Sequence, residues 1–154
     1  MVQYRNILLA TDFSESAREA AAHAAAIAGA ANATLHILHV IEEFSYWENF
    51  NLKTFPSPDV LDELRSNARL ALEDLFEAQE REGLSVETHV RNGKPFIEII
   101  RAARDLEADV VVIGSHGVSG LAETLFGSTA EKVVRKAPCA VLVVRHPEHT
   151  FTLP

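Results

Sequence analysis

The sequence predicts an α/β domain built on a doubly wound, five-stranded parallel sheet with four helices. Short apolar runs alternate along the chain with stretches whose apolar residues recur at helical spacing. Regular alternation of this kind favours βαβ units and a parallel sheet. No linker, repeat or low-complexity segment interrupts it, so we expect residues 1–154 to form a single domain with an unpatterned tail at 146–154.

The five predicted strands are short runs rich in Val, Ile and Leu. They cover residues 7–10, 35–41, 84–90, 109–114 and 138–144. Continuous apolar runs such as the first are typical of strands buried on both faces of a sheet. The third run alternates apolar and polar residues, which predicts a half-exposed strand.

Four helical patterns separate these strands. The first follows two candidate N-caps, Ser14 and Ser16, and Glu19 lies three residues after Ser16 as a capping box requires. Its narrow alanine-rich face ends near Gly29 and predicts close packing against the sheet. The other helical patterns cover residues 58–83, 95–106 and 121–136.

Composition excludes several classes of protein. A net charge of −8 without a basic run disfavours nucleic acid as a partner. The single cysteine, Cys139, allows no internal disulfide and suits a reducing compartment. The start of the chain lacks a signal-peptide pattern, and no apolar run approaches the length of a membrane span. We therefore expect a cytoplasmic protein without membrane insertion.

Unusual residues follow two of the predicted strands. Thr11 and Asp12 follow the first strand, and a Gly-Ser-His-Gly segment at 114–117 ends the fourth. Ligands of doubly wound sheets bind at the carboxyl ends of strands, where the winding reverses. A reversal between these two strands brings both segments to one crevice. The alternative for Asp12 is a helix cap.

Residues 114–128 read Gly-x2-Gly-x9-Gly-Ser. Gly114 and Gly117 allow the backbone to turn sharply and to approach a ligand. Gly127, Ser128 and Thr129 precede a helical stretch at 130–136, whose free N–H groups attract anions. The segment therefore predicts a polyphosphate site that needs no lysine.

Three histidines lie in or near these segments, at positions 36, 39 and 116. His116 lies within the glycine pattern and is a candidate donor to a phosphate, with structural packing as the alternative. His36 and His39 point to opposite faces of a regular strand, so they are not expected to bind one metal ion together.

Other nucleotide and signalling classes lose their main support. The chain has no Gly-x4-Gly-Lys-Ser/Thr, and its first strand is not followed by Gly-x-Gly-x-x-Gly. A receiver domain needs a phosphoacceptor aspartate after its third strand, where this chain has His-Val-Arg-Asn at 89–92.

The glycine pattern and four segments of the chain, one of which lies within that pattern, together resemble the universal stress protein family. The segments are residues 7–14, 38–41, 114–117 and 138–144, and the resemblance covers about residues 3–146. Gly-x2-Gly-x9-Gly-Ser/Thr is the signature of ATP-binding members of that family. The resemblance implies a Rossmann-like fold, similar to the adenine nucleotide alpha hydrolases, with strand order 3-2-1-4-5.

The resemblance also implies a binding site for ATP, or for AMP or ADP, with Mg²⁺ or Mn²⁺ as candidate ions on the phosphates. Asp12 corresponds to a ribose ligand, the backbone of Val40 to an adenine ligand, and the start of the last helix to the β- and γ-phosphate site. Gly114 and Gly117 correspond to residues that line the ribose and phosphates. The full set of expected site residues is Ala10, Thr11, Asp12, Val40, Ile113, Gly114, His116, Gly117, Gly127, Ser128 and Thr129.

We expect a homodimer joined by antiparallel addition of the last strand, Ala140, Val141, Leu142, Val143 and Val144, which that order leaves at an apolar sheet edge. The expected function is that of a nucleotide-binding regulator or sensor of stress with an unidentified client protein. One alternative is a slow ATPase or related adenylate-handling enzyme, although no general base, arginine finger or Walker lysine is evident. The other is an interaction module with a vestigial pocket.

Five aromatic residues crowd the segment 42–58. We expect most of them to be at least half buried, with the adenine, the protein's own loops and a partner chain as the alternative contacts.

Overall fold

The computed structural model describes residues 1–42, 57–76, 81, 83–116 and 127–146. Five strands form one parallel sheet in the order β3-β2-β1-β4-β5. The strands are β1 (Asn6–Ala10), β2 (Thr34–Ile41), β3 (Ser85–Asn92), β4 (Val110–Gly114) and β5 (Ala140–Val144). The helices among the described residues are α1 (Glu15–Ala31), α3 (Pro58–Asp74), α5 (Pro95–Asp105) and α6 (Ser128–Lys136). The predicted fold class and strand order are confirmed.

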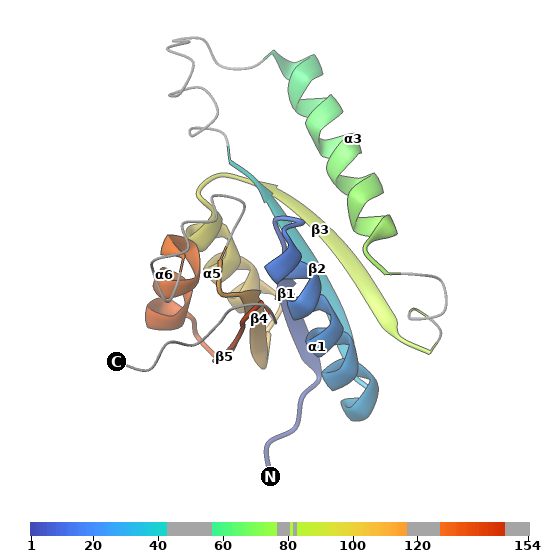
Figure 1. Cartoon of the computed structure of the whole chain (residues 1–154), viewed down its shortest axis with the longest axis vertical. Coiled ribbons are helices and arrows are strands. Elements are labelled where there is room, and N and C mark those ends of the chain that lie inside the picture. Colours follow the sequence, from blue (N-terminus) through green and yellow to red (C-terminus); the bar gives the residue numbers. More distant parts are fainter. Residues whose placement is uncertain (43–56, 77–80, 82, 117–126, 147–154) are drawn as a thin grey trace.

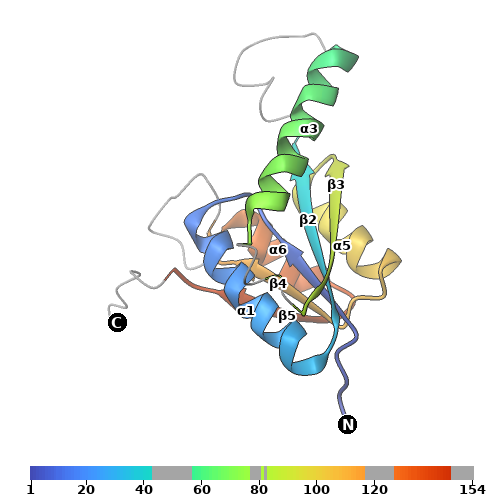
Figure 2. The ribbon, with the colours of Figure 1, turned by 90° about the vertical axis from the view of Figure 1, so that its right-hand side faces the viewer.

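Helices cover both faces of this sheet (Figures 1 and 2). α1 and α3 pack on the face to which Ile7 and Leu9 of β1 point, and α5 and α6 pack on the face of Leu8. Because successive side chains of a strand point to opposite faces, a central strand between two helical layers must be apolar throughout. Ile7, Leu8 and Leu9 indeed have no exposed surface.

The ends of several strands and helices differ from those that the sequence predicted. β3 contains only exposed and half-buried residues, which agrees with the half-exposed strand that its pattern predicted. The described part of the last helix begins at Ser128, and residues 117–126 lie outside the described part of the chain, as do residues 43–56 with their aromatic side chains. No helix among the described residues is long and apolar enough to cross a membrane.

The start of α1 decides between the two candidate caps. Ser14 is the N-cap, and its hydroxyl accepts a hydrogen bond from the backbone N–H of Ala17 at 3.2 Å. Ser16 is buried instead, with its hydroxyl 3.5 Å from the carbonyl oxygen of Val144 on β5. Asn32, in the left-handed conformation, ends the helix three residues after Gly29.

Gly114 ends β4 where the first turn of α1 leaves no room for a side chain. A Cβ at this position lies 2.8 Å from the backbone carbonyl carbon of Ser16 and 3.0 Å from the backbone nitrogen of Ala17. Backbone atoms of a helix move only with the helix. The structure therefore gives Gly114 a packing role that the sequence did not suggest, besides its place at the predicted ligand site.

We predict that Gly114→Ala destabilises the protein by about 1–3 kcal/mol, because overpacking displaces α1 from β4. Gly29→Ala is the matched control. Its Cβ meets only the Leu84 side chain at an ordinary 3.6 Å, and alanine improves helix propensity by up to about 1 kcal/mol. Urea unfolding of both variants provides the measurement, and equal stability of Gly114→Ala and wild type contradicts the packing role.

Candidate functional site

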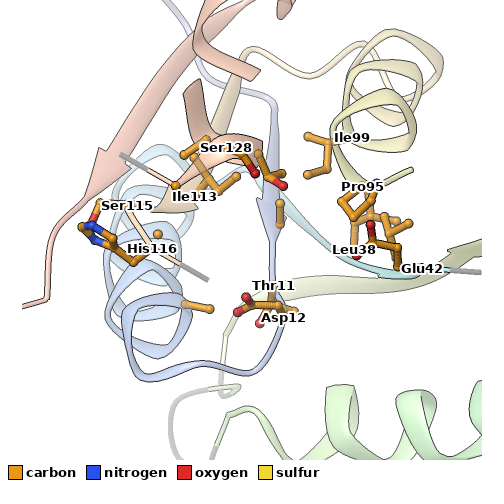
Figure 3. A pocket seen from close by; sticks show the side chains of 17 residues that line it. Thr11, Asp12, Leu38, Glu42, Pro95, Ile99, Ile113, Ser115, His116 and Ser128 are labelled. Carbon is orange, nitrogen blue, oxygen red and sulfur yellow. The ribbon is translucent and has the colours of Figure 1, made fainter. Parts of the chain in front are cut away.

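A cavity of about 630 Å³ opens at the carboxyl ends of β1, β2 and β4 (Figure 3). Its volume lies within the roughly 300–1,000 Å³ of known ligand pockets. The described residues that line it are Ala10, Thr11, Asp12, Ala17, Leu38, Val40, Glu42, Pro95, Ile99, Ile113, Gly114, Ser115, His116, Gly127, Ser128, Thr129 and Ala130. Every expected site residue that the structure describes is among them, and Gly117 lies outside the described residues.

The cavity exists because β1 ends before β2. Pairing between them stops at Ala10 and Leu38, and one further bond joins the N–H of Thr11 to the carbonyl of Leu38 at 2.9 Å. β2 then continues to Ile41. Val40 therefore extends past the last paired residue of β1, and it borders the cavity as expected.

A tight turn after β1 holds Asp12 at the cavity. An oxygen of the Asp12 carboxylate accepts a hydrogen bond from the N–H of Ser14 at 3.0 Å, and the hydroxyl of Thr11 accepts one from the N–H of Phe13 at 3.1 Å. Phe13 has a φ of 64°, in the left-handed region. Because Ser14 caps α1, the alternative that Asp12 is the helix cap is wrong, and Asp12 instead stabilises the turn.

His39 contacts the same turn through Thr11 and Phe13. Its Nδ1 lies 2.9 Å from the carbonyl oxygen of Thr11, and its ring centroid lies 4.6 Å from that of Phe13. Burial lowers the pKa of His39 below its ordinary value, although the Thr11 carbonyl and the Asp12 charge act in the opposite direction. A neutral ring that carries its proton on Nδ1 donates that proton to Thr11.

Two backbone hydrogen bonds hold Ser115, the residue after β4, one to the end of β5 and one to the start of α6. The N–H of Ser115 donates to the carbonyl of Val144 at 2.8 Å, and the N–H of Gly127 donates to the carbonyl of Ser115 at 2.6 Å. The second of these bonds brings the two ends of the segment 115–127 together. The glycine pattern thus begins and ends at the cavity.

α6 begins at the cavity wall. Gly127 is its N-cap, and the first bond of the helix runs from the N–H of Glu131 to the carbonyl of Gly127 at 3.0 Å. The amides of Ser128, Thr129 and Ala130 precede that bond, so they have no partner within the helix. The helix therefore starts two residues earlier than expected, and Ser128 and Thr129 belong to its first turn rather than to a preceding loop.

The carboxylates that line this cavity make its wall acidic. Among the lining residues that the structure describes, Asp12 and Glu42 carry carboxylates, and none is a lysine or arginine. His116 borders the cavity with its Nδ1 2.9 Å from the hydroxyl of Ser115. A bound anion therefore relies on backbone amides, hydroxyls and the positive end of the α6 dipole.

Sequence reasoning missed one side of the cavity, formed by Leu38, Pro95 and Ile99. Leu38 shares a face of β2 with Val40, and Pro95 and Ile99 lie one turn apart at the start of α5. Both spacings are visible in the sequence. The sequence does not show that α5 begins beside the end of β2.

The sequence profile of the universal stress protein family matches residues 3–145. The chain belongs to the universal stress protein family. It is 33% identical over 146 residues to the universal stress protein MJ0531 of Methanocaldococcus jannaschii, covering 94% of this chain and 84% of that one.

Solved structures of this family have the same fold. The structure of MJ0577, also from M. jannaschii, is 33% identical, covers 96% of this chain and 99% of its own, and superposes with a TM-score of 0.80. A universal stress protein in complex with cAMP is 27% identical, covers 93% of this chain and 98% of its own, and has a TM-score of 0.61.

The lowered pKa of His39 predicts that stability falls as the pH falls. The unfolded chain takes up the proton near the ordinary value of 6.5, whereas the folded chain takes it up only at lower pH. Unfolding then binds protons, so the free energy of unfolding falls from about pH 7 downward until the folded-state pKa is reached.

Urea unfolding at several pH values tests this, with His39→Gln as the variant. Wild type should lose more stability on acidification than the variant, in which this site no longer titrates. Part of the slope should remain, because burial also lowers the pKa of His89. Identical pH dependence in the two proteins contradicts the assignment.

Proposed function

We propose that the cavity binds an adenine nucleotide, with ATP as the first candidate and ADP and AMP as alternatives, and that the protein is a nucleotide-dependent regulator or sensor in the stress response. The convergence of Asp12, the end of β4 and the first turn of α6 on one cavity carries this proposal. Membership of the universal stress protein family supports it, as does the relative in complex with cAMP.

We propose one orientation for the nucleotide in this cavity, based on the residues that line it. Adenine lies against the apolar side chains of Leu38 and Ile99, with its polar edge at the backbone of Val40. The ribose lies over the end of β1, within reach of Asp12. The phosphates then point to the first turn of α6, where amides that lack helical partners are available. Gly117 joins this proposal on its sequence position alone.

A divalent cation has a clear electrostatic role in this arrangement. The phosphates bring negative charge to a wall that already carries Asp12 and Glu42. Mg²⁺ or Mn²⁺ on the phosphate oxygens offsets that repulsion, and both ions prefer oxygen ligands. ATP affinity should therefore depend on the ion, and AMP affinity much less.

We predict that Asp12→Asn weakens ATP binding about 10- to 100-fold, the value of a hydrogen bond to a charged acceptor. Asparagine can still accept from the N–H of Ser14 through its carbonyl oxygen, so the turn should survive. Its amide nitrogen cannot accept from a ribose hydroxyl. Calorimetric titration with ATP measures the loss, and Asp59→Asn, an exposed position in the first turn of α3, is the matched control.

The ribose assignment is tested by the same titration with 2′-deoxy- and 3′-deoxy-ATP. Wild type should discriminate against at least one of them, and Asp12→Asn should not, because each change removes one partner of the same hydrogen bond. No binding of any adenine nucleotide at millimolar concentration sinks the proposal as a whole.

Experiments distinguish the proposed sensor from two other functions, an ATPase and an interaction module. An ATPase releases phosphate steadily, typically at about one turnover per second or faster, whereas a sensor does not. An interaction module with a vestigial pocket dimerises equally well with and without Asp12 and purifies without nucleotide.

We also propose that the protein is a homodimer joined along β5. This strand forms one edge of the sheet and consists of Ala140 and four larger apolar residues. The carbonyl of Val144 accepts from the N–H of Ser115, just after β4, so strand alternation directs the N–H of Val143 away from β4. A second β5 strand can accept that hydrogen bond.

Val143→Pro should convert the dimer to a monomer, because it removes the outward amide while proline's φ remains compatible with an edge strand. Light scattering after gel filtration gives the molecular mass. Val143→Ala, which trims the side chain and keeps the amide, should remain dimeric. A dimeric Val143→Pro protein places the contact elsewhere.

A further inference from the structure

Three metal-ligating side chains meet on β2 and β3, on the sheet face to which Leu38 points. His36 pairs with Glu87 in the strand register, and His89 follows two residues later on the same face. His36 is only 6% exposed, whereas the side chain of Glu87, on the edge strand, is 59% exposed. The cluster therefore combines a buried ligand with an opening to solvent.

The donor atoms converge at metal-ligand spacing. His36 Nδ1 lies 3.1 Å from His89 Nε2 and 3.4 Å from Glu87 Oε2. The third distance, between Glu87 Oε2 and His89 Nε2, is 4.0 Å. All three donor atoms lie within 4.8 Å of one another. Nitrogen and oxygen ligands about 2.0–2.2 Å from a tetrahedral ion lie about 3.3–3.5 Å apart. Small side-chain rotations bring these atoms to that geometry.

Asn6 prepares His36 for this role. The other ring nitrogen of His36, Nε2, lies 3.4 Å from the Oδ1 oxygen of Asn6 at the start of β1. An acceptor at that position favours the tautomer that is protonated on Nε2, which leaves a lone pair on Nδ1. Metal-binding histidines commonly donate their second N–H in this way, and the donor bond fixes the ring orientation.

One hydrogen bond accounts for the closest contact in this cluster. A single proton between His36 Nδ1 and His89 Nε2 satisfies the 3.1 Å contact. The Glu87 carboxylate faces both nitrogens, 3.4 Å from His36 Nδ1 and 4.0 Å from His89 Nε2. A cation at the centre interacts favourably with all three donor atoms at once.

The geometry points to a binding site for Zn²⁺ or a similar first-row transition ion at His36, Glu87 and His89. Two imidazoles and one carboxylate suit Zn²⁺, whereas Mg²⁺ and Ca²⁺ prefer oxygen ligands. Three protein ligands leave a fourth position for water. The bound ion joins the edge strand β3 to its neighbour β2 and stabilises the folded chain.

This site is separate from the cavity. None of its three residues lines the cavity, which lies at the carboxyl ends of the strands, and His36 lies four residues before Val40 on β2. Four residues of a strand span about 13 Å. The metal site therefore does not depend on the proposed nucleotide, and the two are tested independently.

Calorimetric titration of the chelator-treated, nucleotide-free protein with ZnCl₂ tests the site. We expect one saturable site in wild type, with a rise in melting temperature on binding. Glu87→Gln and His89→Gln should each weaken Zn²⁺ binding at least about tenfold. Glu87→Gln alters an exposed side chain, so its melting temperature in chelator should equal that of wild type.

Two matched controls make the result specific. His23→Gln, at an exposed position on α1, should bind Zn²⁺ like wild type, as should Asp12→Asn at the cavity. Co²⁺ in place of Zn²⁺ should give the visible absorption of a tetrahedral site in wild type and not in His89→Gln. Absence of a saturable site, or equal affinity in Glu87→Gln, His89→Gln and wild type, overturns the assignment.

Discussion

The parallel pairing of β1 with both β2 and β4 is the constraint from which the rest of the structure follows. The chain leaves β1 towards α1 on one face of the sheet, and β4 leads towards α6 on the other. Beyond the end of the short β1, α1 and α6 diverge to opposite faces of the sheet, while β2 continues past the end of β1. This divergence leaves a crevice at the carboxyl ends, as at the switch points of other doubly wound sheets. No additional structural element is needed to form the cavity.

The proposed anion site of this acidic protein relies on fixed donors rather than on mobile charged side chains. The chain carries a net charge of −8, and the described cavity wall has no lysine or arginine. Amides in the first turn of a helix carry partial positive charge that remains aimed at the cavity. Binding by such donors depends on where the backbone lies. The hydrogen bonds from Ser115 to Val144 and from Gly127 to Ser115 set that position.

β2 connects two chemically different regions of the molecule. Its alternation directs His36 towards Asn6 and the edge strand β3, and it directs His39 towards the turn after β1. One region offers imidazole and carboxylate ligands near the amino half of the strands. The other offers backbone donors and apolar surface at their carboxyl ends. The rigid sheet between them gives each region a fixed geometry without any shared residue.

Much of the fold was predictable from local patterns. The apolar run of β1, the alternation of β3 and the alanine face of α1 follow from side-chain periodicity, which depends only on neighbouring residues. The glycine pattern likewise predicted that Gly127 and Ser128 line the cavity. Glycines and hydroxyl residues at the start of a helix favour anion binding through local backbone geometry alone. The strand order followed from the family resemblance, since periodicity alone does not choose among the possible orders.

Contacts between distant residues were decided only by the tertiary structure. The packing of Gly114 against Ser16 depends on the distance between two elements almost one hundred residues apart. The choice of Ser14 over Ser16 as cap shows only in the folded chain, where Ser16 is buried with its hydroxyl 3.5 Å from the carbonyl oxygen of Val144. His36 was correctly separated from His39 by strand alternation, but its neighbours Glu87 and His89 required the register between β2 and β3. A sequence determines which way a side chain points along its own strand, whereas only the folded chain determines what it meets there.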